Sequence, residues 1–279
     1  MNAGKLIFLD IDGTLTIPGS NILPASAQKA IQKARENGHL IFLCTGRNYK
    51  MLSPLLSYGF DGVIGSSGGY VEVDGKVIYE HPLSQQERVR ILEVLRQNQI
   101  FCTVESREGS YTDEGFKEFL MEHAGEGANS ELLRWRRQIE GNLDIRPMGE
   151  YDGETAYKVI YMSMDSQAVG AAVELLNGDF SIIMQGIDQY GVTNGEIVAK
   201  GLDKGAAVAR VAAYLNRSME DTVGFGDSTN DKELLETVAL GICMDNGTAD
   251  LKEIADEICP AVSEDGIYRA FLAHGWICG

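Results

Sequence analysis

The chain has 279 residues, which is long enough for two domains. Hydrophobic residues make up 44% and charged residues 23%, a composition that excludes disordered and fibrous classes. Acidic residues outnumber basic residues by 41 to 24, so the net charge is −17. This charge disfavours nucleic acids and anionic membranes as partners, although it also fits a role in solubility alone. The five Cys residues show no metal-binding spacing, and no segment has signal-peptide or membrane-span character. We therefore expect a cytoplasmic protein with free thiols.

The first third of the chain alternates between short apolar runs and helical patterns. Strands are predicted at 5–11, 39–44 and 62–65, with helices at 24–37 and 48–57 between them. This order is typical of a parallel sheet. Residues 70–80 differ, because two alternating runs flank Asp74-Gly75 and predict a hairpin.

The pattern changes after residue 81. A capping box from Ser84 to Glu87 predicts a helix to about 97, followed by a strand at 100–104 and a polar stretch to about 155. Further strands are predicted at 158–164, 180–185 and 189–194, with a helix at 166–176. We interpret 82–194 as an α+β insert with an antiparallel sheet.

Alternation of helix and strand resumes after the insert, with helices at 203–216, 229–237 and 248–256 and strands at 221–227 and 238–244. The predicted fold class is therefore α/β, with a discontinuous parallel-sheet core at 1–81 and 195–279 and a smaller second domain at 82–194.

Polar motifs follow the core strands, where open parallel sheets place their ligand sites. The first motif runs from Asp10 to Thr14. Asp10 and Asp12 would share one face of an extended chain, and Gly13 lets the chain turn sharply. Such a pair suits a Mg²⁺-assisted nucleophile and a proton-transferring acid, but on its own it also fits an ordinary turn.

The second motif is Thr45-Gly46-Arg47, after the second strand. A hydroxyl, free backbone N–H groups and a guanidinium suit a phosphate oxygen. A helix N-cap by Thr45 explains the motif equally well.

Two later motifs complete the set. Lys204 is predicted at the start of a helix, where a cation is mildly unfavourable, so it suits a countercharge to a nucleophile and a phosphate. A solvated lysine with Asp203 as the cap is the simpler alternative. Asp227 ends a strand, and Asn230 and Asp231 follow within one turn. Hard oxygen ligands of this kind suit Mg²⁺, and a capped turn is the alternative.

The four motifs, in this order, resemble those of the haloacid dehalogenase superfamily of phosphohydrolases. The insert between the second and third motifs is similar to the cap of the Cof-like branch. Met244 to Gly247 is similar to a Gly-Asn-Ala loop of that branch, with Gly in place of Ala. Gly65 to Gly69 departs from the Asn-Gly-Ala that usually follows the third strand, which leaves the substrate contacts there open.

The resemblance implies a Rossmann-like core and a role for each motif residue. Asp10 would attack phosphorus, and Asp12 would protonate the leaving oxygen and then activate water. Thr45 and Lys204 would bind the phosphoryl group, with Gly13, Gly46, Arg47 and Asn230 around it. Mg²⁺ would be held by Asp10, the Asp12 carbonyl and Asp227, and completed by Asn230 and Asp231 directly, through water or through Lys204.

The expected activity is hydrolysis of a small phosphorylated metabolite such as a sugar phosphate. Arg107, Arg134, Arg136 and Arg137 in the insert are candidate anion contacts, or ordinary surface residues. A phosphomannomutase-like transferase and a non-catalytic metabolite sensor are the alternatives. The sequence does not indicate the oligomeric state.

Overall fold

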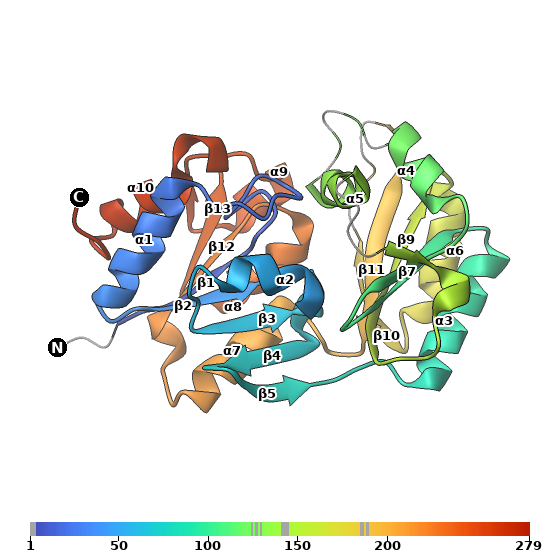
Figure 1. The fold of residues 1–279 in the computed structure, drawn as a ribbon, viewed down its shortest axis with the longest axis horizontal. Helices are drawn as coiled ribbons and strands as arrows, with labels where there is room; N and C mark the ends of the chain where they lie inside the picture. The colour runs from blue at the N-terminus through green and yellow to red at the C-terminus, as the bar shows by residue number, and fades with distance from the viewer. Residues whose placement is uncertain are drawn as a thin grey trace. The chain divides into compact units, whose positions relative to one another are not determined.

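The fold comes from a computed structural model that describes residues 4–279, except 124, 126–127, 129, 141–144, 185–186 and 188–189. The described chain divides into two compact units (Figure 1). The first unit comprises residues 1–47, 52–80 and 203–279, and the second comprises 48–51 and 81–202. The insert therefore reaches Leu202, eight residues beyond its expected end at 194.

The first unit contains an eight-stranded sheet in the order β14-β13-β12-β1-β2-β3-β4-β5. Its strands are β1 (Leu6–Leu9), β2 (Leu40–Cys44), β3 (Gly62–Gly65), β4 (Tyr70–Val73), β5 (Lys76–Glu80), β12 (Thr222–Gly226), β13 (Leu240–Met244) and β14 (Glu257–Cys259). The pairs from β14 to β3 are parallel, and β4 and β5 add an antiparallel hairpin at one edge. This sheet confirms the predicted α/β class.

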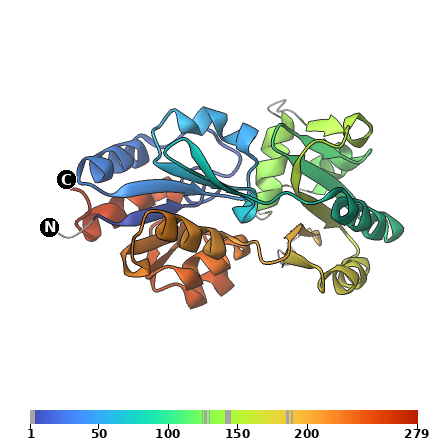
Figure 2. The same cartoon turned by 90° about the horizontal axis from the view of Figure 1, so that it is seen from below.

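Helices cover both faces of this sheet (Figure 2). They are α1 (Ala25–Glu36), α2 (Tyr49–Leu56), α7 (Lys204–Tyr214), α8 (Lys232–Thr237), α9 (Ala249–Ile254) and α10 (Gly266–Ala273). Ile7 and Leu9 pack on the side of α1 and α10, whereas Leu6 and Phe8 pack on the side of α7 and α8. Because alternate residues of β1 meet different helices, the strand is apolar throughout, as strands buried on both faces are.

The second unit contains a six-stranded sheet in the order β10-β11-β9-β6-β7-β8. Its strands are β6 (Phe101–Ser106), β7 (Ser110–Thr112), β8 (Ile145–Pro147), β9 (Ala156–Ser163), β10 (Phe180–Met184) and β11 (Thr193–Ala199). All pairs are antiparallel except β7 with β8. The antiparallel α+β insert was predicted, but β11 begins four residues after the strand expected at 189–194.

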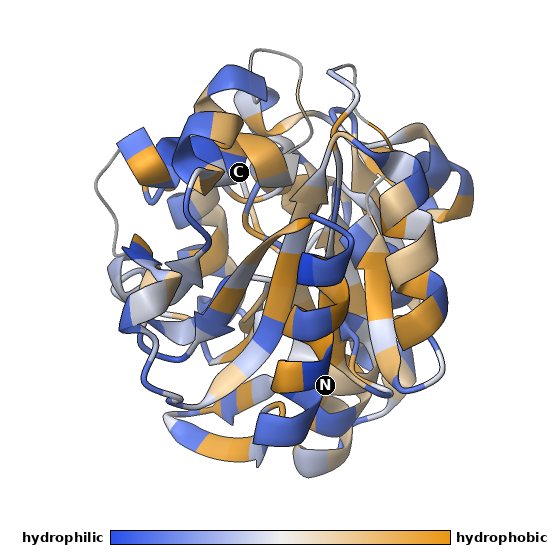
Figure 3. Cartoon of the chain, turned by 90° about the vertical axis from the view of Figure 1, so that its right-hand side faces the viewer, coloured by the Kyte–Doolittle hydropathy of each residue, from blue (hydrophilic) through white to orange (hydrophobic). Residues whose placement is uncertain are grey.

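Four helices accompany this sheet, and hydrophobic and hydrophilic residues lie side by side along them (Figure 3). They are α3 (Gln85–Gln97), α4 (Phe116–His123), α5 (Ser130–Glu140) and α6 (Ser166–Leu176). The predicted capping box opens α3: Ser84 Oγ accepts from Glu87 N, and Glu87 accepts from Ser84 N. Trp135 of α5 is fully buried and packs against Phe116 of α4 with the rings edge to face.

Within the described part of the chain, no helix is both long and apolar enough to cross a membrane.

Candidate active site

Three of the predicted site residues follow neighbouring parallel strands of the first unit. Asp10 comes directly after β1, Thr45 after β2 and Asp227 after β12. Because β12, β1 and β2 are adjacent and parallel, their carboxyl ends meet at one edge of the sheet. The topology thus places these side chains where open α/β sheets carry ligand sites.

Lys204 joins two of the predicted acids. Its Nζ donates to Asp10 Oδ1 at 2.7 Å and to Asp231 Oδ1 at 2.5 Å, and its side chain is fully buried. Burial lowers the pKa of the ammonium, but Asp10 and Asp231 outweigh burial and hold the pKa well above its ordinary value. Lys204 is the first residue of α7, and Asp203 caps the helix by accepting from Ala206 N. The lysine is therefore buried, and the solvated alternative is wrong.

Three carboxylates gather beside this lysine. One oxygen each from Asp10, Asp227 and Asp231 lie within 4.8 Å of one another, and all three residues are buried. Burial and then the charge of Asp231 raise the pKa of Asp10 to about 8, against the lowering effect of Lys204. Burial and then Asp10 raise the pKa of Asp227 well above its ordinary value. When all three acids are ionised, one lysine leaves a net negative charge here, which a bound divalent cation would offset.

The donor set fits a hard divalent cation. Asp227 Oδ1 is buried and has no hydrogen-bond partner. Asp231 is already engaged, because Oδ1 accepts from Lys204 and Oδ2 accepts from the N–H groups of Asp227 and Ser228 at 3.0 and 3.2 Å. Carboxylate oxygens are the ligands that Mg²⁺ takes. The geometry therefore favours Asp10 and Asp227 as direct ligands and Asp231 as the residue that fixes Lys204.

Glycines keep the backbone close to these acids. Gly13 has φ +88°, and a Cβ there would stand 2.2 Å from Asp227 Oδ2. A Cβ on Gly226 would stand 2.4 Å from Asp231 Cβ. Both contacts are closer than a Cβ permits without a shift of its neighbour. Glycine at 13 therefore lets the first motif approach the fourth, and glycine at 226 lets the fourth motif fold back on itself.

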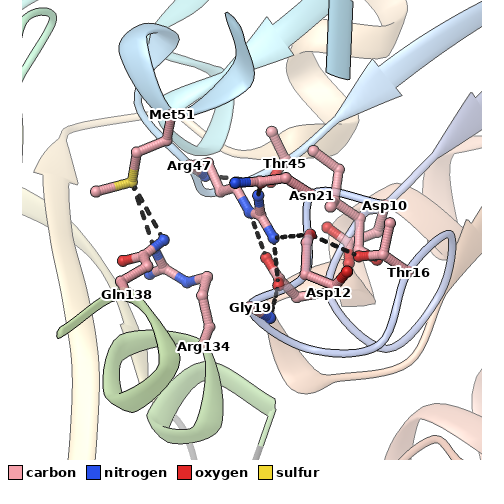
Figure 4. Close-up of polar contacts among 12 residues, drawn as sticks. Asp10, Asp12, Thr16, Gly19, Asn21, Thr45, Arg47, Met51, Arg134 and Gln138 are labelled. Atoms are coloured by element: carbon pink, nitrogen blue, oxygen red, sulfur yellow. Dashed lines mark hydrogen bonds and ion pairs between the residues drawn. The ribbon is translucent and has the colours of Figure 1, made fainter. Parts of the chain in front are cut away.

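Asp12 does not share the environment of Asp10. Strand β1 ends at Leu9, so the extended geometry expected to align the two acids is absent. Arg47 takes both Asp12 oxygens, with Nε at 2.7 Å from Oδ2 and Nη2 at 2.6 Å from Oδ1 (Figure 4). In this structure the guanidinium of Arg47 therefore binds Asp12, whereas the sequence predicted a contact with phosphate.

Thr45 lies in the loop after β2, with Gly46 between it and Arg47. Its hydroxyl accepts from Arg47 N at 3.1 Å, which leaves the hydroxyl proton for another acceptor. Helix α2 begins only at Tyr49, and Asn48 Oδ1 accepts from Met51 N there. The alternative of Thr45 as the helix cap is therefore wrong.

The remaining fourth-motif residue, Asn230, lies in a 3₁₀ turn (Thr229–Asp231) before α8. Ser228 Oγ donates to Asn230 Oδ1 at 2.7 Å, and Asn230 is buried. Asn230 directly precedes Asp231 of the acid cluster, so its predicted part in metal and phosphate binding stays a prediction.

Two asparagines of this region, Asn246 and Asn21, make side-chain contacts that were not predicted from the sequence. Asn246, in the loop similar to Gly-Asn-Ala, donates from Nδ2 to Gly13 O at 2.7 Å and accepts from Val262 N at 3.1 Å. Asn21 accepts from Arg47 Nη1 at 2.7 Å. The loop resemblance pointed to Asn246, whereas nothing in the local pattern distinguishes Asn21.

The serine turn that replaces the expected Asn-Gly-Ala is tied to the second motif. Ser66 N donates to Arg47 O at 2.9 Å, and Ser67 N donates to Thr45 O at 3.1 Å. Both serines have positive φ, 50° and 55°. These left-handed conformations are strained for residues other than glycine, and such strain often accompanies functional loops.

The four candidate arginines of the insert differ in exposure. Arg134 is fully buried, with Nη1 4.0 Å from Glu105 Oε1. Arg136 pairs with Glu140 at 3.0 Å, one helical turn away, and Arg107 lies over the Tyr49 ring. Arg137 follows Arg136 on α5. Of these four arginines, Arg134 is thus the strongest candidate for a role beyond surface charge, because it alone is fully buried.

The sequence profile of the haloacid dehalogenase-like hydrolases matches residues 7–271. With this fold and this acid–lysine cluster, the chain belongs to that family and is a phosphatase of its Cof-like branch.

Its relatives span nearly the whole chain. YkrA of Bacillus subtilis (strain 168) is 27% identical, covering 97% of this chain and 98% of its own. The HMP-PP phosphatase of Yersinia pseudotuberculosis serotype IB (strain PB1/+) is 23% identical, covering 98% and 95%. The solved structure of the subclass IIB sugar phosphatase BT4131 superposes with a TM-score of 0.78 at 22% identity, covering 98% and 100%.

Proposed function

We propose that this phosphatase is a Mg²⁺-dependent phosphomonoesterase that acts through an aspartyl-phosphate on Asp10. The observation that carries the proposal is the buried cluster in which Lys204 joins Asp10 to Asp231 beside Asp227. A buried nucleophile needs its charge held and countered, and Lys204 does both for Asp10.

The chain's own residues account for the proton and bond changes. Asp10 attacks phosphorus in line, forming one P–O bond as the bond to the leaving oxygen breaks. Asp12 gives its proton to that oxygen, and it then takes a proton from the water that attacks the aspartyl-phosphate. Phosphate departs and Asp10 is regenerated. Asp10 and Asp227 would hold Mg²⁺, which supplies charge neutralisation for the transferring phosphoryl group.

A small phosphorylated metabolite is the proposed substrate. The related proteins include one named HMP-PP phosphatase and one named sugar phosphatase. Thr45 and Lys204 are the proposed contacts to the phosphoryl group, with backbone N–H groups around Gly13, Gly46 and Asn230. Specificity is expected to reside in the insert, because superfamily and fold leave the substrate open.

The test is phosphate release from a panel of phosphorylated sugars, nucleotides and cofactors, with Mg²⁺ or EDTA. Asp10→Asn keeps the shape of the side chain but removes the nucleophile, so we expect a loss of at least about 10³-fold in kcat. Asp74→Asn is the matched control, because Asp74 is exposed in a hairpin turn with φ 49°, which Asn tolerates.

Two results would count against this function. One is phosphate release that persists in EDTA or in Asp10→Asn. The other is an isomerised sugar phosphate as the product instead of free phosphate.

A further inference from the structure

The side chain of Arg47 is buried and almost fully committed within the first unit. It is 2% exposed, and the Asp12 side chain is 5% exposed. Nε and Nη2 form a two-pronged contact with the Asp12 carboxylate at 2.7 and 2.6 Å. A planar guanidinium that holds both oxygens of a carboxylate fixes the rotation of that carboxylate as well as its position.

The loop after the first motif closes around this pair (Figure 4). Gly19 N donates to Asp12 Oδ1 at 2.6 Å. Arg47 Nη2 also donates to Ser20 O at 3.1 Å, and Nη1 donates to Asn21 Oδ1 at 2.7 Å. Three consecutive loop residues thus hold Asp12 and the arginine that orients it.

The backbone of Arg47 is fixed as well. Its N–H donates to Thr45 Oγ1 at 3.1 Å, and its carbonyl accepts from Ser66 N at 2.9 Å. With the main chain tied to two loops and the guanidinium tied to a third, Arg47 has little freedom to turn toward another anion.

The number of N–H groups left on Arg47 distinguishes its two possible roles, which are to bind phosphate and to orient Asp12. A guanidinium has five N–H groups, and the contacts to Asp12, Ser20 and Asn21 use four of them. The fork that recognises a phosphate needs two parallel N–H groups, and one remains.

We infer that Arg47 and Asn21 are positioning residues for Asp12: Arg47 aims the carboxyl that protonates the leaving oxygen, and Asn21 holds Arg47 in place. The inference rests on the proposed function, because it needs Asp12 to act as the proton donor. Neither residue need touch the substrate.

This role has a consequence that depends on the leaving group. When the P–O bond of an alkyl phosphate breaks, the departing alkoxide needs the proton of Asp12. The p-nitrophenolate of p-nitrophenyl phosphate is a stable anion and departs without one. A misaligned Asp12 therefore slows alkyl phosphates much more than p-nitrophenyl phosphate. A lost phosphate contact slows both substrates equally.

The experiment compares Asn21→Ala and Arg47→Lys with the unaltered protein, at saturating Mg²⁺. We measure kcat/KM for the best sugar phosphate and for p-nitrophenyl phosphate, since kcat/KM covers the steps up to leaving-group departure. General acid catalysis contributes roughly 10²–10⁴-fold, so each variant should lose at least about tenfold more on the sugar phosphate. The inhibition constant of inorganic phosphate should stay within about twofold.

Asn21→Asp is the conservative control. Asp keeps an oxygen at the position that accepts from Arg47 Nη1, so it should restore the unaltered ratio between the two substrates. A role of Asn21 in loop stability alone would not depend on the leaving group. If Arg47→Lys does not fold, Asn21→Ala and Asn21→Asp still decide the question.

Each other outcome overturns the inference. Equal losses on both substrates, or a parallel rise in the phosphate inhibition constant, would make Arg47 a phosphate ligand or a purely structural residue. If the unaltered protein hydrolyses neither substrate, the proposed function fails and the inference fails with it. If it hydrolyses both and the ratio does not move, only the inference fails.

Discussion

Asp10 and Asp12 lie two residues apart, yet each is paired with a different cation. Asp10 binds Lys204, 194 residues later, and Asp12 binds Arg47, 35 residues later. The residue types and their placement after β1 were predictable from sequence. The pairing was not, because it depends on how α7 and the loop after β2 pack. The sequence predicted a phosphate contact for Arg47 and gave no sign of its hydrogen bonds to Asp12.

Gly13 provides a test of how closely the first and fourth motifs must approach. Gly13→Ala adds a Cβ 2.2 Å from Asp227 Oδ2 and places a side chain at φ +88°. Displacement of Asp227 by about 1 Å should lower Mg²⁺-dependent kcat/KM on the order of 100-fold. Steady-state kinetics over a range of Mg²⁺ concentrations would also show a weaker apparent affinity for the metal.

Gly38→Ala is the matched control for this substitution. Gly38 has nearly the same φ, +86°, but a Cβ there meets nothing within 4 Å. Both variants should lose about 1 kcal/mol of unfolding free energy to the left-handed backbone. Only Gly13→Ala should lose activity, and an equal loss in Gly38→Ala would assign the effect to backbone strain.

At the scale of elements, the core was more predictable than the insert. Apolar runs bounded by turn residues located β1, β2 and β3, and Asp74-Gly75 located the hairpin. Strand β11 was misplaced because it contains Asn194, Gly195 and Glu196, which have low strand propensity. Its environment explains Gly195: a Cβ there would stand 2.4 Å from both Ile183 O and Tyr161 Oη.

Strand β11 also contributes to a buried row of charges on the second sheet. Lys158 Nζ of β9 lies 2.6 Å from Glu196 Oε1 of β11 and 3.1 Å from Glu105 Oε2 of β6. All three side chains are at most 4% exposed. A sequence pattern cannot find this row, because it crosses three strands.

Lys158→Met should destabilise the second unit strongly. Without the ammonium group of Lys158, Glu105 and Glu196 stay buried without that partner, which should lower the free energy of unfolding by about 3–5 kcal/mol. Urea unfolding followed by far-UV circular dichroism measures the loss. Lys232→Met is the matched control, because Lys232 is 51% exposed and 3.9 Å from Glu236, so its loss should stay below about 1 kcal/mol. Similar losses in both variants would show that the row contributes nothing beyond surface charge.

At the scale of the whole molecule, the order of motifs located the insert, and packing fixed its end. Residues 195–202 belong with the second unit, because β11 pairs along its length with β9 and β10. Part of the acidic excess behind the net charge of −17 lies in the first unit, where three buried carboxylates gather beside the buried Lys204. We therefore expect the acid cluster to link the stability of the chain to pH and, under the proposed function, to Mg²⁺.

Without Mg²⁺, the protein should become less stable between about pH 4 and pH 8. The folded pKa of Asp10 is about 8, raised from 3.8, so the folded protein holds a proton there that the unfolded chain releases. The stabilisation from Asp10 is complete below pH 3.8 and is lost as pH rises through 8. Mg²⁺ competes with that proton, so the rise in Tm on adding Mg²⁺ should grow from pH 6 to pH 8.

Thermal unfolding in EDTA and in Mg²⁺, at pH 6, 7 and 8, tests this linkage. Mg²⁺ at 100 times its Kd should add about 2.7 kcal/mol at the higher pH. Asp10→Asn has no proton to lose, so in EDTA its stability should fall less with pH than that of the unaltered protein. The difference between the two proteins isolates one carboxyl among the 41 acidic residues. A Mg²⁺ effect on Tm that is independent of pH, or equally large in Asp10→Asn, would show that Mg²⁺ binding does not depend on Asp10. That result would argue against the acid cluster as the Mg²⁺ site.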